Sequence, residues 1–217
     1  MFSKKIEINL EKPDDIIHLE PISDIHIGHA GFDEEHYKKR IKAISKDKNR
    51  YTFFGGDALD AITTYDKRFN PDMSLEHDID NQRLRWQNLS QKLFDIHAEQ
   101  KNEKVWGFFH GNHDYKIPQI SRAYLQNTMC TPNNLTFLGS RGVLGLEVKY
   151  NKKILAQWSI LFMHGSGGGK PERMMEQMKH NAYYDVFLCG HLHQKRYQPE
   201  IAYDFDWESG KTWERDI

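Results

Sequence analysis

The chain has 217 residues, of which 38% are hydrophobic and 28% are charged, and its formal net charge is −1 at pH 7. This length suits a single domain, residues 1–217, and the balanced charge excludes an overall basic surface for nucleic acid, so any site for a polyanion has to be local. No stretch approaches the ~20 apolar residues of a membrane span, and the first residues lack the apolar segment of a secretion signal, so we expect a cytoplasmic protein that does not contact a membrane.

The two cysteines, Cys130 and Cys189, do not have the CxxC spacing of zinc or redox motifs. Cys189 ends the apolar run DVFLC, which predicts a reduced thiol buried in the core. This usage fits a reducing compartment.

The first elements that the sequence predicts are two strands. Apolar residues alternate along 4–10, residues 13–15 form a turn, and 16–23 reads as a second strand. We expect the two strands to pair as a hairpin. Pro21, near the end of the second strand, argues against an undisturbed central strand because proline cannot donate to the ladder.

A helix and then a buried strand follow. Asp33 can cap a helix whose apolar residues Tyr37, Ile41 and Ile44 share one face, and 51–54 is a short apolar run. Together with the preceding strand these residues predict a strand, helix, strand unit.

The middle of the chain predicts a loop, a long helix and another strand. Residues 62–80 show no sustained period and are expected to form a surface loop. The next helix is indicated by an apolar stripe of Trp86, Leu89, Leu93 and Ile96, and it leads into the apolar strand 105–109.

In the second half, Pro118 can begin a helix that runs through Leu125, and strands 142–150 and 153–163 flank a turn at Asn151 and Lys152. Three methionines predict a helix packed on the core before the strand 185–189; they are Met174, Met175 and Met178. Strands joined partly by helices and partly by hairpins predict a mixed α/β domain.

Polar clusters follow five of the apolar strands. They are SDIHIG at 23–28, GGDALD at 55–60, GNHD at 111–114, MHG at 163–165 and CGHLH at 189–193. Any one of them is explained as a turn with capping polar residues. Five together indicate a common site, because loops beyond the ends of strands in α/β sheets converge on one crevice.

The residue types in these clusters suit a metal site. Aspartate, asparagine and histidine without cysteine form an oxygen and nitrogen ligand set that favours Mn, Fe or Zn over a thiolate-bound ion. The number of candidate ligands is enough for two ions, and a pair of ions ~3.5–4 Å apart is the arrangement of two-metal phosphoesterases.

The sequence resembles the calcineurin-like metallophosphoesterases, whose pattern D-x-H, G-D, G-N-H-[DE], H, G-H-x-H occurs here complete and in order between residues 24 and 193. The resemblance implies a sandwich of two mixed β-sheets flanked by helices, with two divalent metal ions at the strand ends. It assigns Asp24, His26 and His193 to one ion, Asn112, His164 and His191 to the other, and Asp57 to both. Mn is the first expectation, with Fe, Zn or Ni as alternatives.

The same resemblance gives roles to three further residues. His113 is expected beside the substrate, where it would protonate the leaving oxygen. Asp60 stands at the last position of G-D-x-x-D, where relatives keep a carboxylate that bonds this histidine. Asp114 is expected to fasten its own turn. Because Ala61 and Asp114 replace the Arg and Glu of protein Ser/Thr phosphatases, that subfamily is disfavoured.

Residues outside the pattern provide candidate substrate contacts. His29 follows the first cluster, Lys67 and Arg68 lie in the irregular loop, and Lys170 and Arg173 follow the glycine-rich segment GSGGGK. That segment is not a nucleotide-binding P-loop, because His164 stands where the motif requires its first glycine. Its glycines predict a mobile loop beside a metal ligand.

The tail from Gln194 to Ile217 alternates apolar and polar residues around a turn at Ser209 and Gly210. It predicts a hairpin that leaves one sheet edge unfinished, and relatives continue with more sheet. We therefore expect either a truncated chain or an edge completed by another chain.

The resemblance implies a metal-dependent phosphoester hydrolase, a phosphodiesterase before a monoesterase, in which a metal-bridging hydroxide attacks phosphorus. The substrate would be a phosphorylated small molecule or a nucleic-acid fragment, and no oligomeric state is specified. Three alternatives stay open: a nuclease for single-stranded or short nucleic acid, a phosphomonoesterase, and a non-catalytic metal-binding scaffold. The scaffold is disfavoured because such members lose metal or acid residues, and none is missing here.

Overall fold

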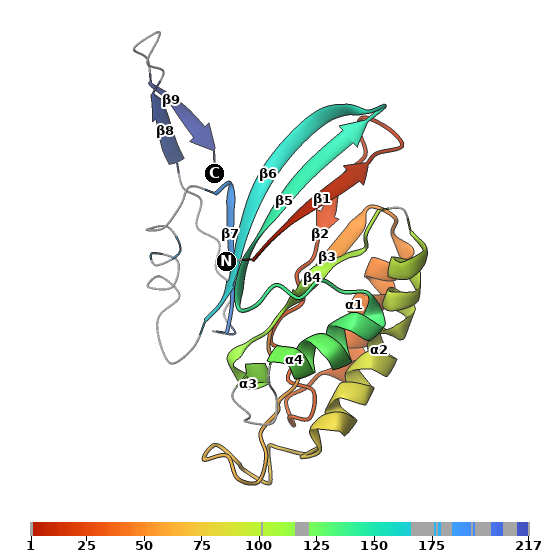
Figure 1. Ribbon diagram of the computed structural model, residues 1–217, viewed down its shortest axis with the longest axis vertical. Helices are drawn as coiled ribbons and strands as arrows, with labels where there is room; N and C mark the ends of the chain where they lie inside the picture. The colour runs from red at the N-terminus through yellow and green to blue at the C-terminus, as the bar shows by residue number, and fades with distance from the viewer. Residues whose placement is uncertain are drawn as a thin grey trace.

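The computed structural model describes residues 2–100, 102–115, 122–165, 176, 178, 184–191, 193, 201–205 and 212–216. These residues form an α/β structure with a four-stranded mixed sheet, a three-stranded parallel sheet and flanking helices (Figure 1). This confirms the predicted fold class at the level of α/β. Among the described residues, no helix is both long and apolar enough to cross a membrane.

The mixed sheet has the order β1-β5-β6-β7, made by Phe2–Asn9, Arg141–Tyr150, Lys153–His164 and Val186–Gly190. β1 is parallel to β5, β5 is antiparallel to β6, and β6 is parallel to β7. The predicted β5–β6 hairpin is confirmed, and both residues of its two-residue turn have the positive φ that such tight turns require.

The parallel sheet has the order β2-β3-β4, made by His18–Leu19, Arg50–Gly55 and Val105–Phe109. The predicted hairpin between the first two strands is therefore wrong, because β1 pairs with β5 and β2 pairs with β3 in the other sheet. Alternation along 4–10 specifies a strand but not its partner. β2 is only two residues long, and after Pro21 only a single bridge from Ile22 to Phe54 continues the pairing.

Two long helices cover one face of the parallel sheet. α1 (Glu34–Lys46) begins at Asp33, whose side chain accepts a hydrogen bond from the backbone N–H of His36, as predicted. α2 (Ile79–Glu99) begins in the same way at Asp78. Figure 1 shows α1 and α2 on the side of β3 and β4 that faces away from β1, β5 and β6.

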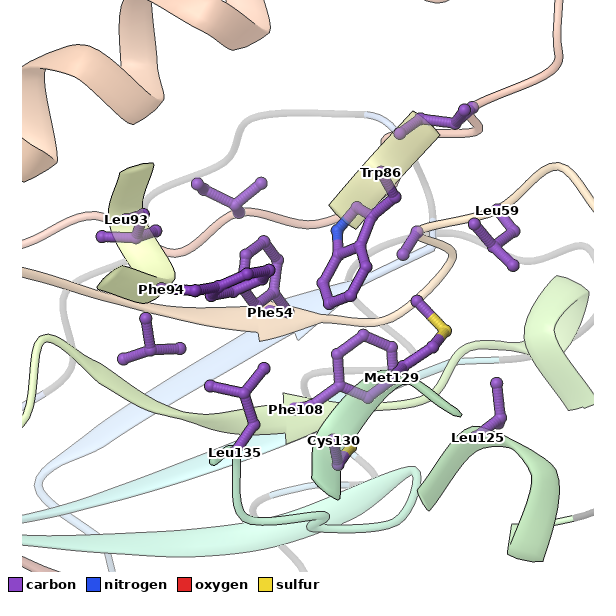
Figure 2. Packing of buried hydrophobic residues seen from close by; sticks show 14 of the residues in the cluster. Phe54, Leu59, Trp86, Leu93, Phe94, Phe108, Leu125, Met129, Cys130 and Leu135 are labelled. Atoms are coloured by element: carbon purple, nitrogen blue, oxygen red, sulfur yellow. The ribbon is translucent and has the colours of Figure 1, made fainter. Parts of the chain in front are cut away.

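The core has two apolar clusters, one on each face of the parallel sheet. In the first, Trp86, Leu93 and Phe94 of α2 pack on Phe54 and Phe108 (Figure 2). The second contains residues of both sheets: Tyr51, Phe53, Trp106 and Phe109 of β3 and β4 meet Ile6, Ile8, Leu144, Leu146, Val148, Ile160 and Phe162 of β1, β5 and β6. Because both faces of β3 and β4 are buried, these strands are continuous apolar runs in the sequence.

Short elements complete the described chain. They are α3 (Asn112–Tyr115), α4 (Arg122–Leu125), the π-helix η1 (Gln126–Cys130), the 3₁₀-helix η2 (Thr131–Asn133), β8 (Ile201–Phe205) and β9 (Thr212–Asp216). The predicted tail hairpin is confirmed, since β8 and β9 are antiparallel, and within the described chain they pair only with each other.

Some predicted details differ from the structure or lie outside it. Cys189 is exposed rather than buried and lies on β7, the last described strand of the mixed sheet, whereas Cys130 is buried. Met178 is buried, as expected of a core methionine. Pro118, Met174 and Met175 lie outside the described residues.

Candidate metal centre

The five predicted polar clusters converge at one end of the two sheets. The backbone N–H groups of Asp24 and His26 donate to the carbonyls of Gly56 and Asp57, at 3.0 Å each, which joins the first cluster to the second. The third cluster is joined by the backbone N–H of His113, which donates to Asp57 Oδ1 at 2.7 Å. The fifth is joined by His191, whose backbone N–H lies 2.9 Å from Asp24 Oδ1.

The first ligand group consists of Asp24, His26 and His193, the trio predicted for one ion. His193 Nε2 lies 3.2 Å from Asp24 Oδ1 and 3.2 Å from His26 Nε2. Two imidazole nitrogens that face each other beside a carboxylate present more lone pairs than protons, which is the arrangement that a cation needs. The Ser23 hydroxyl lies 2.5 Å from Asp24 Oδ2 and holds this carboxylate in place.

The second ligand group consists of Asp57, His164 and His191. His164 is buried, its Nδ1–H donates to the carbonyl of Gly55 at 2.7 Å, and its Nε2 lies 3.1 Å from Asp57 Oδ2. The carbonyl fixes the ring so that the Nε2 lone pair points into the site, as in metal-ligating histidines generally.

Asp57 lies between the two groups. Its Oδ2 is 3.1 Å from His164 Nε2 and 4.0 Å from His26 Nε2, so one carboxylate oxygen is close to both. Asn112, the remaining predicted ligand, follows Gly111 at the start of α3, and its buried Oδ1 has no hydrogen-bond partner among the described residues. A buried acceptor without a partner is costly, and an ion would satisfy it.

His113 is held beside the first group rather than in either predicted trio. Its ring centre is 4.5 Å from that of His26, and its Nδ1 lies 2.7 Å from the backbone carbonyl of Asp60. Its Nε2 lies 3.0 Å from Arg68 Nη1. His26, Asp60 and His113 also form a third group whose ligand atoms are close enough for a cation.

The Asp60 carboxylate is buried and faces two histidines. Its Oδ1 lies 3.7 Å from His113 Nδ1 and 3.7 Å from His26 Nδ1, and neither of its oxygens has a hydrogen-bond partner among the described residues. The expected partner of His113 is thus present, but the backbone carbonyl of Asp60 makes the shorter contact. The approach of Asp60 to His26 was not expected from the sequence.

Charges at the centre shift several pKa values. Burial alone would raise the pKa of Asp57, but the bond to His164 and the neighbouring histidines outweigh it and lower the pKa to about 2. Burial would lower the pKa of His164, but Asp57 raises it to about 8. Burial lowers the pKa of His113, whereas burial and the charge of Asp57 raise that of Asp114 to about 6. The Asp57 carboxylate is thus ionised at neutral pH and supplies negative charge at the centre.

Asp114 fastens its own turn, as predicted. Its Oδ2 accepts from the backbone N–H of Gly111 at 3.0 Å, and its Oδ1 accepts from that of Leu59 at 3.3 Å. The side chain is fully buried, so it positions the third cluster against the second and does not reach the cavity.

The backbone of the ligand loops is strained. Five predicted ligands have left-handed φ values, namely Asp24 at 55°, His26 at 52°, Asp57 at 48°, His191 at 91° and His193 at 50°. Such values are uncommon for residues other than glycine and cost about 1–3 kcal/mol each. Their concentration in these loops is typical of a functional site.

Glycines in the motifs allow the loops to approach one another closely. A Cβ at Gly111 would lie 2.0 Å from Asp57 Oδ1, and one at Gly190 would lie 2.5 Å from Ser23 Oγ. Gly56 has a φ of +91°, and a Cβ there would lie 2.6 Å from His164 Nδ1. Each of these glycines therefore leaves space for a side chain of the centre.

A cavity of about 410 Å³ opens over the centre. It is lined by residues of both ligand groups together with Ile25, His29, Asp60, Ile62 and His113. His29, a predicted substrate contact, thus lines the cavity, and its Nδ1 accepts from the backbone N–H of Gly31 at 2.9 Å.

The other predicted substrate contacts differ in where they lie relative to the cavity. Arg68 reaches His113, whereas Lys67 is exposed and has no contact with the cavity among the described residues. Lys170 and Arg173 lie outside the described residues. The sequence reasoning missed Asp66, which binds the Arg68 guanidinium; its position two residues before Arg68 is the signal that could have identified it.

Comparison of the chain with protein-family models and with curated proteins finds no match in either set.

Proposed function

We propose that this protein is a phosphoester hydrolase that uses two divalent metal ions and prefers phosphodiesters. The observation that carries the proposal is the position of Asp57 Oδ2, which lies 3.1 Å from His164 Nε2 of one ligand group and 4.0 Å from His26 Nε2 of the other. When bound, two such ions supply a nucleophile at neutral pH and neutralise charge on the phosphoryl oxygens.

The donor set fits the proposed ions. Asp24, His26 and His193 would hold one, Asn112, His164 and His191 the other, and Asp57 would contact both. The orphaned Oδ1 of Asn112 supports this assignment, because a buried acceptor without a partner is unfavourable, and the facing Nε2 atoms of His26 and His193 can both direct lone pairs to a cation. Oxygen and nitrogen donors without a thiolate favour Mn, with Fe, Zn or Ni as alternatives.

The same proposal places the chain in the calcineurin-like metallophosphoesterase family, as a single domain with two sheets packed as a sandwich. The completeness of the motif pattern supports the family. The sandwich is supported by the apolar cluster in which residues of β3 and β4 meet residues of β1, β5 and β6.

In the proposed reaction His113 protonates the leaving oxygen. Its Nδ1 is occupied by the carbonyl of Asp60, at 2.7 Å, so the substrate would meet Nε2, which contacts Arg68 Nη1 at 3.0 Å. Asp60 orients this ring, and the bond from Nδ1 to its carbonyl partly offsets the burial that lowers the pKa of His113.

The preference for diesters is supported by the charge of the cavity. Among the described residues that line it, none is a lysine or an arginine. A diester carries one negative charge, whereas a monoester dianion gains more from additional cationic side chains.

The experiment is a metal-screened activity panel. Chelated protein is reloaded with Mn, Fe, Zn or Ni and assayed with bis-p-nitrophenyl phosphate, p-nitrophenyl phosphate and single-stranded DNA. We expect metal-dependent hydrolysis that is fastest on the diester and is lost in Asp57→Asn. Preference for the monoester or for DNA would replace the diester assignment with the corresponding alternative. Metal binding without hydrolysis of any ester would indicate the scaffold.

A further inference from the structure

A segment between the second and third motifs begins at the cavity, which its first residue, Ile62, lines. It runs from residue 62 to residue 78, and Gln82 of α2 holds its start by accepting from the backbone N–H of Ala61 at 3.0 Å. Its far end returns to the first motif, where the backbone N–H of Ala30 donates to Met73 at 2.7 Å and that of Leu75 donates to Gly28 at 2.8 Å. The start of the segment is therefore fixed to α2, and its far end is fixed to the loop of the first motif.

Within this segment the guanidinium of Arg68 is held by Asp66. Its Nε and Nη2 lie 3.0 and 2.6 Å from the two carboxylate oxygens, and the backbone N–H of Arg68 donates to the same carboxylate at 2.8 Å. The turn is closed by the backbone N–H of Asp66, which donates to Thr63 at 2.9 Å. A forked pair of this kind fixes the plane of the guanidinium and directs its remaining N–H groups.

The remaining nitrogen, Nη1, points to the metal centre. It lies 3.0 Å from His113 Nε2, and because Nδ1 of that ring faces the carbonyl of Asp60, Nε2 accepts from the guanidinium. Arg68 itself does not line the cavity, and the described lining contains no lysine or arginine. The charge of Arg68 is thus presented at the side of the site where His113 lies.

We propose that Arg68 binds an anionic group, a carboxylate or a phosphate, carried by the leaving group of the substrate. This inference rests on the proposed function, in which His113 marks the leaving-group side. During hydrolysis the P–O bond to the leaving group breaks, a P–O bond to a water oxygen forms, and the leaving oxygen takes the electron pair and a proton. To receive that proton from His113 Nε2, the leaving oxygen has to displace Arg68 Nη1 from this atom. The guanidinium then lies beside the substituents of the leaving group.

Two features separate this role from a general contact with the phosphoryl group. The described distances put Arg68 next to the acid and give it no contact with either ligand group. Asp66 occupies Nε and Nη2 only, and a side chain that is one-third exposed keeps room for a second anion at Nη1. The substrate class is therefore a phosphodiester whose departing alcohol is itself an anion.

The test uses two methyl aryl phosphates of matched shape, one with a 4-carboxyphenyl and one with a 4-carbamoylphenyl leaving group. Charge-assisted hydrogen bonds are worth about 1.5–3 kcal/mol, so we expect the protein to favour the carboxylate ester by roughly tenfold to a hundredfold in kcat/KM. Arg68→Met should remove this preference, because it should slow the carboxylate ester more than the carbamoyl ester. The control is Arg83→Met, which removes an arginine paired with Asp80 on α2 and should keep the preference.

A second readout does not depend on turnover. Calorimetry with (4-carboxybenzyl)phosphonate and (4-carbamoylbenzyl)phosphonate should show the same preference in binding, and Arg68→Met should again abolish it. A 4-phosphonophenyl ester in the kinetic series distinguishes phosphate from carboxylate as the preferred anion.

If both esters are hydrolysed but their ratio is unchanged in Arg68→Met, the inference is overturned while the proposed function stands. If neither ester is hydrolysed with any metal, the proposed function fails, and the phosphonate binding alone decides the role of Arg68.

Discussion

His113 and Asn112 are adjacent in the chain, yet their side chains have different partners. The Asn112 amide oxygen is buried without a partner among the described residues, whereas His113 Nδ1 and Nε2 face Asp60 and Arg68. Neighbouring residues at the start of α3 point in different directions, so an ion held by Asn112 does not need His113.

The first prediction follows from this separation. His113→Ala should retain its metal but lose about 10²–10⁴-fold of its turnover on esters with poor leaving groups, because general acids typically contribute this much. A p-nitrophenolate leaving group needs little protonation, so the loss on bis-p-nitrophenyl phosphate should be much smaller. Asp60→Asn should show a milder form of the same bias.

The measurement compares an alkyl and a p-nitrophenyl diester in both variants, with metal content determined alongside. Equal losses on the two substrates would contradict the assigned role, as would loss of metal in His113→Ala.

For individual residues, the sequence predicts which residue types form the candidate site better than it predicts their contacts. Six Asp and His candidate ligands fall into the expected groups because each follows a strand that ends at the same edge. The second neighbour of Asp60, His26 Nδ1 at 3.7 Å, was not predicted, since that distance depends on how two strained loops meet. The fork between Asp66 and Arg68 was missed for a similar reason, because the loop between the motifs has no period to interpret.

Among the elements, the loop after β4 depends on a glycine. A methyl group at Gly111 would lie 2.0 Å from Asp57 Oδ1 and 2.5 Å from its backbone nitrogen, and a buried loop cannot move away from both. We predict that Gly111→Ala displaces Asp57 and therefore loses both metal content and activity. The matched control is Gly145→Ala on β5, where an added Cβ meets nothing within 4 Å.

Metal analysis and the midpoint of urea unfolding, measured on both variants, test this prediction. Retention of two ions in Gly111→Ala would show that the close approach of the loops is not required.

His97 gives a prediction about pH. This buried residue of α2 accepts from the backbone N–H of Val105 at its Nδ1 and contacts the Asn134 carbonyl through Nε2, and burial lowers its pKa. The folded protein therefore resists the proton that the unfolded chain binds below its ordinary pKa of about 6.5, so stability falls as the pH drops through that value.

The measurement is the urea midpoint of chelated protein at about pH 7.5 and about pH 5.5, on either side of the unfolded pKa. His97→Gln should lose less stability on acidification than the unmodified protein, and the exposed-site control His36→Gln should lose as much. An identical loss in all three proteins would show that His97 does not contribute.

The elements themselves were predicted more completely than their pairing. The strands at 51–54, 105–109 and 185–189, both long helices and the β5–β6 hairpin are present because periodicity and turn residues specify them locally. The hairpin at the N-terminus was wrong because partners are chosen by long-range packing, and β1 fills a place beside β5 that is about 140 residues away in the chain.

For the whole molecule, composition and element order are enough to predict an α/β structure, and the described residues confirm it. The packing of the two sheets also explains why the candidate site lies at the ends of the strands. β3 and β4 are buried between the helices and the mixed sheet, so the ionisable groups of the second and third clusters follow the ends of these strands. What the sequence could not supply is the side-chain geometry of that end, on which the two-ion proposal depends.

The central claim is that Asp57 joins two metal ions in one centre. The most direct measurement is the electron paramagnetic resonance spectrum of protein loaded with two equivalents of Mn²⁺. We predict the spectrum of a spin-coupled pair, which Asp57→Asn abolishes and the exposed control Asp95→Asn on α2 preserves. A spectrum of isolated Mn²⁺ in the unmodified protein, or coupling that survives in Asp57→Asn, would contradict the account.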